Sequence, residues 1–372
     1  MAPVRDAATV ARDAAAAQAA AIATAQAEAE ARRAVVAAER QAARIAQAAV
    51  DACMETVGPP SAEVPVSAAA QAASFDRLRA GFALCQEAAT LAPEAGGPLY
   101  HLGTLAQARG QHREAMTLYE RAAGVGPAHT RLGDYYNFGI GGVRADVDRA
   151  LTAYRAATDL DDPAGMTTLA FMYRLGRGVV RSSGDMIALF QAAAEQGYHF
   201  AQLNLGQTYL TGEGVPRDAN PVLGIPNPRA AVPYLAQAAR AGNMEAAWVL
   251  SSVYAEGADG VAPNAPLRLR WTRVAAQAGH PPAIAALAYL LEQGIGAPKD
   301  PPAAALGYIA ALETGAVVAD ALRAAGGTRP PGWDRQTAIE FQLILQERGL
   351  YLGAIDGIVG PGTLGAARAV AN

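Results

Sequence analysis

Lysine is almost absent from this sequence of 372 residues, and negative charge exceeds positive charge. Lys299 is the only lysine, and 34 acidic residues against 30 basic ones give a net charge of −4. A nucleic-acid-binding protein is expected to carry a basic stripe, which this composition does not supply. We attribute the arginine bias to codon usage rather than to phosphate recognition.

Cysteine and long apolar runs are also scarce. Cys53 and Cys85 are too few for a disulfide framework and lack the spacing of a zinc site. We expect them to be small residues that pack between helices, although in an oxidising compartment they could pair with each other. Nowhere do about 18 apolar residues follow one another without a charge, so no transmembrane span is expected. The N-terminus lacks the apolar core of a secretory signal, and the sequence could be a whole soluble protein or a piece of a longer one.

Aromatic residues make up only 6% of the chain, and much of its 52% hydrophobic content is alanine. Small apolar residues in this proportion suit closely packed helices, so the sequence predicts an all-α fold. Residues 1–57 are rich in alanine and predict one long helix, which ends before Gly58. Its few larger apolar residues do not keep a heptad. The helix is therefore either a self-association or tether element or a lightly docked lead-in, and we leave both readings open.

The stretch 62–127 predicts two helical hairpins of the tetratricopeptide type. In the second of them, small and large residues fall at the positions where that repeat places them, and a proline stops the last helix. The first hairpin, 62–97, is less regular. The matching residues of the second hairpin are Gly103, Ala115, Tyr119, Ala122 and Pro127.

From 128 to 327 a longer unit recurs, with a frame of leucine, small residue, tyrosine, two glycines and valine. The separations between its anchoring leucines are 37, 36, 45 and 37 residues, and the long interval contains a Pro- and Asn-rich insertion at 218–229. The frame resembles the Sel1-like repeat, which implies an α-solenoid of stacked hairpins. The anchoring leucines are Leu132, Leu169, Leu205, Leu250 and Leu287.

A binding surface is predicted along the first helix of each unit, here called helix A. In such a solenoid helix A lines the concave face, and the residues that flank its anchoring leucine point outward. Aromatic residues at such positions are typical anchors for protein partners, although they could instead pack between repeats. The predicted contact residues are Asp134, Asn137, Phe171, Arg174, Gln207, Trp248, Ser252, Tyr289 and Glu292.

No arrangement typical of an active site is found. The five histidines are scattered, and the sequence has neither a metalloprotease motif nor a nucleophile elbow. The glycine-rich turns lack the P-loop pattern and are better explained as helix ends. We therefore expect no enzymatic activity, no cofactor and no metal.

The segment 333–372 predicts an amphipathic helix, a loop and a second helix. Its run Asp-Gly-x-x-Gly-Pro-x-Thr resembles the motif of a small helical peptidoglycan-binding domain found in envelope proteins. The chain departs from that family at Val370 and Ala371, where Phe-Gln is usual. The residues that match the motif are Gln342, Asp356, Gly357, Gly360 and Thr363.

Two functional readings follow. A Sel1-like solenoid joined to such a module resembles the periplasmic part of bacterial polar-localisation scaffolds, which implies protein partners on the solenoid and peptidoglycan on the module. In the alternative reading the protein is a cytoplasmic adaptor or regulator, and the last segment only caps the solenoid. The missing signal favours the second reading, and the motif favours the first, which we prefer.

Overall fold

The computed structural model describes residues 7–212, 226–327 and 330–371. Most of the insertion expected at 218–229 and the terminal Asn372 lie outside these ranges. The chain divides into two compact units. Unit 1 comprises residues 1–59 and 77–122, and unit 2 comprises residues 60–76 and 123–372. The division differs from the predicted hairpin 62–97, because residues 60–76 belong to unit 2 and helix α2 (Ala68–Ala80) crosses the boundary.

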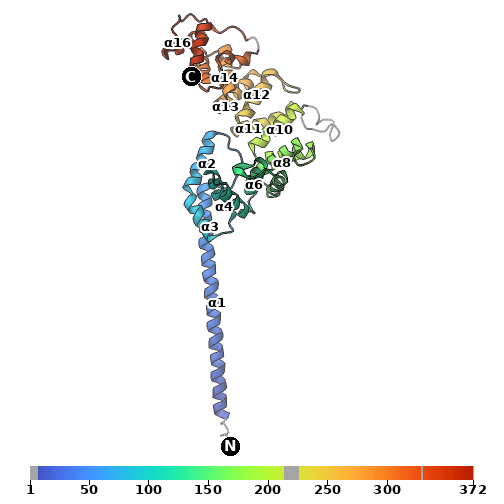
Figure 1. Cartoon of the computed structure of the whole chain (residues 1–372), viewed down its shortest axis with the longest axis vertical. Helices are drawn as coiled ribbons and strands as arrows, with labels where there is room; N and C mark the ends of the chain where they lie inside the picture. The colour runs from blue at the N-terminus through green and yellow to red at the C-terminus, as the bar shows by residue number, and fades with distance from the viewer. Residues whose placement is uncertain (1–6, 213–225, 328–329, 372) are drawn as a thin grey trace. The chain divides into compact units, whose positions relative to one another are not determined.

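Unit 1 is built around α1 (Ala7–Val57), a helix of 51 residues. It contains no glycine or proline, and its alanines give it high helix propensity. Only its C-terminal end packs against α3 and α4, whereas the rest extends beyond these helices (Figure 1). Every described side chain from residue 8 to 45 is exposed. The helices that complete unit 1 are α3 (Phe82–Leu91), α4 (Gly96–Ala108) and α5 (His112–Arg121).

A disulfide between Cys53 and Cys85 joins the end of α1 to α3. This corrects the expectation of two unpaired packing residues. The Cα atoms of the two cysteines are 4.8 Å apart, and both side chains are buried. Such proximity arises because residues Gly81 and Gly97 carry no side chain and let neighbouring helices approach α1: a Cβ at either position would overlap Val57 or Met54.

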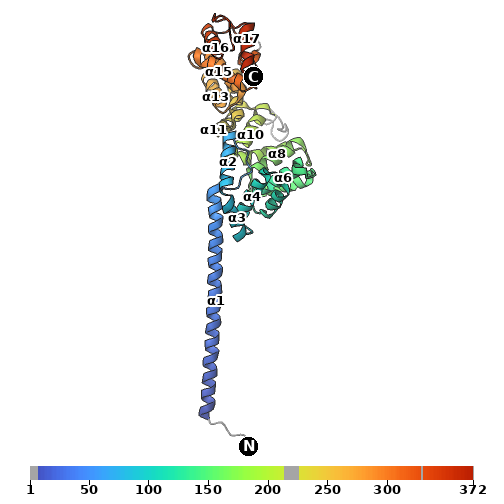
Figure 2. The same cartoon turned by 60° about the vertical axis from the view of Figure 1, so that its left-hand side comes forward.

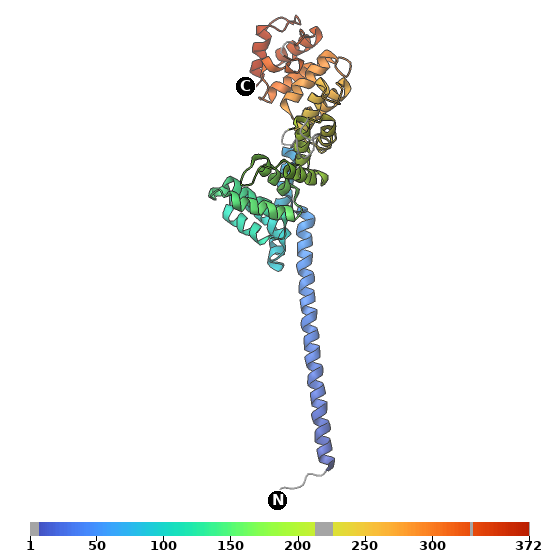
Figure 3. The same cartoon turned by 90° about the vertical axis from the view of Figure 1, so that its right-hand side faces the viewer.

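Unit 2 is a stack of antiparallel helical hairpins, seen from the side in Figure 3. All ten helices from α6 to α15 are 13 residues long. This confirms the all-α solenoid. The bounds are α6 (Gly126–Phe138), α7 (Val147–Asp159), α8 (Pro163–Leu175), α9 (Ser183–Glu195), α10 (His199–Thr211), α11 (Pro228–Arg240), α12 (Met244–Glu256), α13 (Ala265–Gln277), α14 (Pro281–Gln293) and α15 (Pro301–Glu313).

Local sequence sets both ends of these helices. The side chains of Asp146, Asp162 and Asn243 accept hydrogen bonds from backbone N–H groups in the first turns of α7, α8 and α12. Gly139 ends α6 in the left-handed region, with φ of 66°, a conformation that costs residues with a Cβ more than glycine. Such caps and glycine ends recur along the stack and fix the ends of the helices that have them.

Two of the hairpins close through a glycine of helix A placed opposite a large residue of the following helix. Gly133 of α6 faces the ring of Tyr154 on α7, and a Cβ at this position would overlap that ring. Gly206 of α10 faces Leu235 of α11 in the same way. The small residues of the repeat frame are therefore needed where two helices approach most closely.

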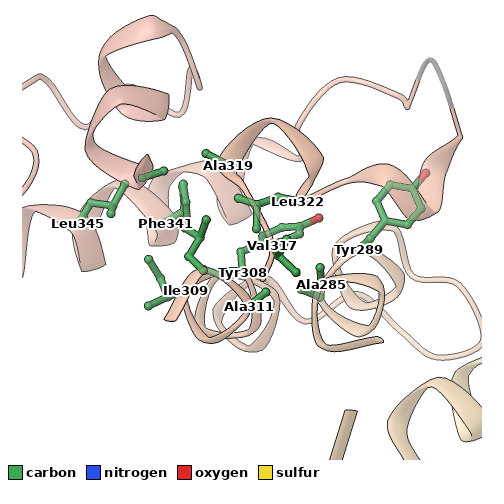
Figure 4. Close-up of a cluster of buried hydrophobic side chains, with 14 of the residues drawn as sticks. Ala285, Tyr289, Tyr308, Ile309, Ala311, Val317, Ala319, Leu322, Phe341 and Leu345 are labelled. Atoms are coloured by element: carbon green, nitrogen blue, oxygen red, sulfur yellow. The ribbon is translucent and has the colours of Figure 1, made fainter. Parts of the chain in front are cut away.

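The last two helices, α16 (Arg335–Glu347) and α17 (Pro361–Arg368), lie beside α15 (Figure 2). Phe341 and Leu345 of α16 are buried in one hydrophobic cluster with Tyr308 and Ile309 of α15 (Figure 4). Ala367 of α17 belongs to the same cluster. The segment predicted as a separate domain at 333–372 thus shares a core with the last repeat, because the apolar faces of its two short helices are completed by α15.

Within the described residues, none of the helices combines the length and the apolar character that crossing a bilayer requires.

Candidate functional site

The predicted contact residues lie on α6, α8, α10, α12 and α14, which we call the helix A row. Asp134 and Asn137 are on α6, Phe171 and Arg174 on α8, and Gln207 on α10. The others are Trp248 and Ser252 on α12 and Tyr289 and Glu292 on α14. The structure divides these residues into two groups, because some line hollows of the surface and others turn into the packed interior.

A first hollow, of about 310 Å³, opens across three successive helices of the row. The predicted residues Arg174 and Gln207 both line it, from α8 and α10, and Val249 closes it from α12. Its remaining lining residues are Thr208, Leu210 and Thr211. An arginine with hydroxyl and amide groups around it favours a carboxylate or a carbonyl-rich segment.

A second hollow, also of about 310 Å³, is almost entirely apolar. Trp248 of α12 forms one wall, and Pro282, Ala285 and Ala286 of α14 form another. The segment from 316 to 325 closes it with residues Ala316, Val317, Ala321, Leu322, Ala324 and Ala325. A cavity of this size and character accommodates an apolar side chain of a partner.

The wall formed by Trp248 is held in place by neighbouring polar groups. The indole ring stacks on the imidazole of His280, with ring centroids 5.1 Å apart. His280 Nε2 lies 3.4 Å from Glu245 Oε2, and this hydrogen bond holds the pKa of Glu245 below its usual range. His280 Nδ1 accepts the N–H of Ala283 at the start of α14. Trp248 is therefore half-buried yet fixed in orientation, as an interaction anchor needs to be.

Four predicted residues turn inward, which corrects the expectation that they point outward. Asn137, Tyr289 and Glu292 are buried, and Phe171 is half-buried with its ring edge on Phe190, 5.2 Å between centroids. The aromatic residues fill gaps between helices, as the alternative reading in the sequence allowed. In contrast, Ser252 is exposed.

Glu292 is the most deeply buried of these residues, with none of its side chain exposed. Its Oε2 accepts hydrogen bonds from Tyr308 Oη at 2.5 Å and from Arg323 Nε at 2.8 Å, and its Oε1 accepts the N–H of Asp334 at 2.8 Å. Burial and the Glu292 charge raise the pKa of the Tyr308 hydroxyl. The carboxylate thus ties α14, α15 and the segment before α16 together.

Asp134 is also engaged within the solenoid. Its Oδ1 accepts the hydroxyl hydrogen of Tyr154 at 2.9 Å, and Arg131 lies 3.7 Å from its Oδ2. Burial raises the pKa of Asp134, and the nearby arginine partly offsets this. The residue is half-buried and positions Tyr154.

The residues of the predicted peptidoglycan motif do come together. Gln342 is fully buried on α16, its Nε2 lies 3.0 Å from Asp356 Oδ1, and its Oε1 accepts the N–H of Gly357 at 2.9 Å. The hydrogen bond from Gln342 Nε2 to the Asp356 carboxylate holds the pKa of Asp356 below its usual range. Thr363 is buried on α17, and Gly360 caps that helix. Their geometry holds the loop between α16 and α17 in shape.

Two residues that the sequence reasoning missed lie in this loop. Leu352 is 95% exposed and Ile358 is 68% exposed, although both are large and apolar. An apolar residue within a glycine-rich loop was the available signal, because such a loop has few neighbours to cover it.

Comparison with known proteins agrees with the hairpin geometry. A family model described as Sel1 repeat matches five consecutive segments: 126–162, 163–198, 199–243, 245–280 and 281–308. Residues 126–308 are Sel1 repeats. Repeats of this family typically serve as protein-interaction scaffolds, which agrees with the hollows along the helix A row.

One solved structure shows the same fold over two thirds of the chain, and a second is similar at a lower TM-score. A Sel1 repeat protein from Oxalobacter formigenes is 24% identical, with a TM-score of 0.50, over 67% of this chain and 99% of that one. A protective antigen of uropathogenic Escherichia coli strains, c5321, is 21% identical with a TM-score of 0.44, over 78% of this chain and 70% of that one.

A curated relative from Schizosaccharomyces pombe, chitin synthase regulatory factor 3, is 28% identical over 214 residues. The match covers 54% of this chain and 22% of the relative. The chain therefore spans less than a quarter of that relative's length.

Within the ranges that the structure describes, His, Cys, Asp and Glu side chains do not gather into a group that could hold a metal ion.

Proposed function

We propose that this protein is a non-enzymatic scaffold of the bacterial cell envelope that binds protein partners along its helix A row. The observation that carries the proposal is the pair of hollows, one containing Arg174 and the other walled by Trp248. Val249 and Trp248 are neighbours in sequence and line different hollows, so both hollows meet at α12. A segment with an acidic residue and a large apolar residue fits this arrangement.

A displayed peptide library provides the test. Selection on the intact chain is expected to enrich peptides that pair an acidic residue with a large apolar one. Arg174→Glu and Trp248→Ala are each expected to weaken binding of the enriched peptides by ten-fold or more. Each change removes an anchoring contact, and a loss of about 1.4 kcal/mol of binding free energy corresponds to a factor of ten.

Two exposed residues outside the row supply matched controls: Arg155→Glu for the charge change and Leu306→Ala for the apolar truncation. Both are expected to leave binding unchanged. Equal binding by Arg174→Glu, Trp248→Ala and these controls would refute the assignment to the helix A row.

The envelope location is supported by the disulfide between Cys53 and Cys85. Disulfides persist in the periplasm and outside the cell and are rare in the reducing cytosol. Trapping free thiols with an alkylating reagent in denaturant at the moment of cell lysis tests this part, because both cysteines are buried in the fold. The expected result is that both cysteines escape labelling until a reductant is added. Labelling without reductant would favour the cytoplasmic adaptor.

A second candidate function is peptidoglycan binding by α16, α17 and their loop. It is supported by the resemblance of the motif around Asp356 and by the exposed Leu352 and Ile358, which are free to contact a ligand. The chain is expected to sediment with purified sacculi, and Leu352→Asp with Ile358→Asp is expected to abolish this. Leu306→Asp is the matched control. If all these proteins sediment alike, or none does, the segment acts only as a cap of the solenoid.

A further inference from the structure

A short extended segment, residues 60–66, lies on the surface of unit 2 near the start of α10. Ala62 is only 5% exposed and belongs to a hydrophobic cluster with Met166 and Phe190. Val66 lies against Gly242, just before α12. The segment includes Pro60 and Pro65, which favour an extended backbone. We call residues 60–66 the strap.

The strap is held mainly through the backbone of Val64. The N–H of Val64 donates to Tyr198 Oη at 3.2 Å, and His199 Nε2 lies 2.8 Å from the carbonyl oxygen of Val64. The side chain of Val64 is itself 55% exposed. Both backbone groups of one residue are thus satisfied by two adjacent side chains, which is how an extended peptide is recognised without reading its side chain.

The orientation of His199 is set by Asn243. Asn243 Oδ1 accepts the N–H of Ala246 and so caps α12, which leaves its Nδ2 to face His199 Nδ1 at 2.9 Å. The amide donates to Nδ1, so the imidazole carries its proton on Nε2, where it faces the carbonyl of Val64. Burial raises the pKa of Tyr198 to about 12, so its hydroxyl stays neutral. The side chains of Tyr198, His199 and Asn243 are therefore already oriented to bind the backbone of an extended segment.

Unit 1 contains an independent example of the same device. Tyr100 and His101 are packed edge to face with centroids 5.5 Å apart and an interplanar angle of 69°, and Tyr198 and His199 show 5.5 Å and 70°. His101 Nε2 lies 2.9 Å from the carbonyl oxygen of Gly58. In both units the histidine of a Tyr-His pair thus meets a backbone carbonyl of non-helical chain.

We propose that Tyr198, His199 and Asn243 form a peptide-binding seat, occupied in cis by the strap, which a partner protein's extended segment with a small-x-x-Pro pattern displaces. The pattern is that of Ala62-Glu63-Val64-Pro65 in the strap. The hydrophobic cluster around Ala62 selects a small first residue, the backbone hydrogen bonds fix the third, and proline keeps the segment extended. This seat shares no residue with the two hollows of the helix A row, so it does not depend on their function.

The strap is held weakly enough to be exchanged. Two backbone hydrogen bonds each contribute about 0.5–1.5 kcal/mol net, and burial of one alanine side chain adds little. The valine side chain adds little, because it is more than half exposed. An incoming segment of the same pattern makes the same contacts. Because the strap is tethered beside the seat, the apparent affinity of the incoming segment is its intrinsic affinity multiplied by the fraction of time for which the seat is open.

Fluorescence anisotropy on the intact chain tests the proposal, with a labelled peptide of residues 58–68 as the probe. Val64→Pro removes the N–H that Tyr198 accepts and weakens the strap in cis. The peptide is expected to bind this variant about ten-fold more tightly than the unaltered chain, since one lost hydrogen bond is worth up to about 1.5 kcal/mol. Ala62→Asp, which opens the seat by a different route, is expected to act in the same direction.

Three controls make the result specific. A peptide methylated on the backbone nitrogen of Val64 is expected to bind at least five-fold more weakly. Adding Tyr198→Phe to the Val64→Pro chain is expected to reduce affinity similarly, whereas Tyr254→Phe, a change of the same size at a residue that packs against a different hydrophobic cluster, leaves it unaltered. Equal binding of the plain and methylated peptides, or absence of binding to both opened variants, would overturn the proposal. Dimers of the unaltered chain that the peptide dissociates, detected by sedimentation velocity, would overturn the assignment to a separate partner and give the seat to a second copy.

Discussion

The junction of α1 with α3 in unit 1 and the end of the solenoid at α14 to α16 in unit 2 are stabilised in different ways. The first has small residues and a covalent link between Cys53 and Cys85. The second has large aromatic rings and a buried ion pair between Glu292 and Arg323. A junction of alanines and glycines buries little apolar area for each residue, so a cross-link adds stability that packing does not supply. Where tyrosine, tryptophan and phenylalanine are available, a buried carboxylate can instead be fully hydrogen-bonded.

Glu292→Ala tests the C-terminal side of this comparison and is expected to have the largest effect. It leaves Arg323 buried without its carboxylate, and breaking such a pair destabilises by about 3–5 kcal/mol. The measurement is the free energy of unfolding of the intact chain, with hydrogen exchange to locate the loss in α14 to α16. Glu313→Ala, which removes an exposed partner of Arg348, is the matched control and costs less than about 1 kcal/mol. If both variants lose the same free energy of unfolding, the buried hydrogen bonds of Glu292 stabilise the fold no more than an exposed ion pair does.

Replacing both Cys53 and Cys85 with alanine tests the N-terminal side and is expected to have the next largest effect. The cysteines are 32 residues apart in the chain, and cross-linking a loop of that length is worth about 2–4 kcal/mol. Faster hydrogen exchange is expected in α3 and at the end of α1, with α15 and α16 unaffected. Chemical reduction of the unaltered chain should give the same pattern. If exchange rises instead throughout unit 2, the two regions are not stabilised separately.

Lys299→Ala is expected to change the free energy of unfolding least. It compares an exposed ion pair with the buried pair of Glu292 and Arg323 at the same end of the solenoid. Lys299 Nζ lies 2.7 Å from Asp334 Oδ1, and this contact holds the pKa of Asp334 below its usual range. A carboxylate with a lowered pKa stabilises the fold above the unfolded pKa of about 3.9, and this contribution is lost as pH falls through the folded value. Because Lys299 is about half exposed, we expect a loss below about 1 kcal/mol at pH 7 that disappears once the pH lies below the folded pKa of Asp334. A loss that persists in acid below that pKa would mean that the lysine acts through packing.

The fold could be predicted well from the sequence because its signals are local. The frame of leucine, glycine and tyrosine recurs within each unit, and Leu132, Leu169, Leu205 and Leu250 are all buried as expected. Gly139 and Gly176 end helices in the left-handed region, as expected from glycines after helical segments. Such signals need no knowledge of distant parts of the chain.

The site was harder to predict because burial depends on residues far along the chain. Tyr289 and Glu292 of α14 occupy the repeat positions of Ser252 and Ala255 of α12, neither of which is buried. The two α14 residues are buried because Arg323 and the segment before α16 return over them. In the same way, neither the strap nor the cysteine pair follows from repeat spacing, since both depend on non-helical chain or on the approach of helices from different hairpins.

The disulfide has a mechanical consequence for a scaffold. Cys53 lies four residues before the end of α1, and the exposed part of this helix, at about 1.5 Å per residue, reaches more than 50 Å beyond the packed end. A partner that pulls on the exposed part of α1 applies force to its packed C-terminal end, where few large side chains hold the helix against α3. With the disulfide in place, the force passes from α1 to α3 through a covalent bond. The packed end of α1 therefore cannot separate from α3 one helical turn at a time.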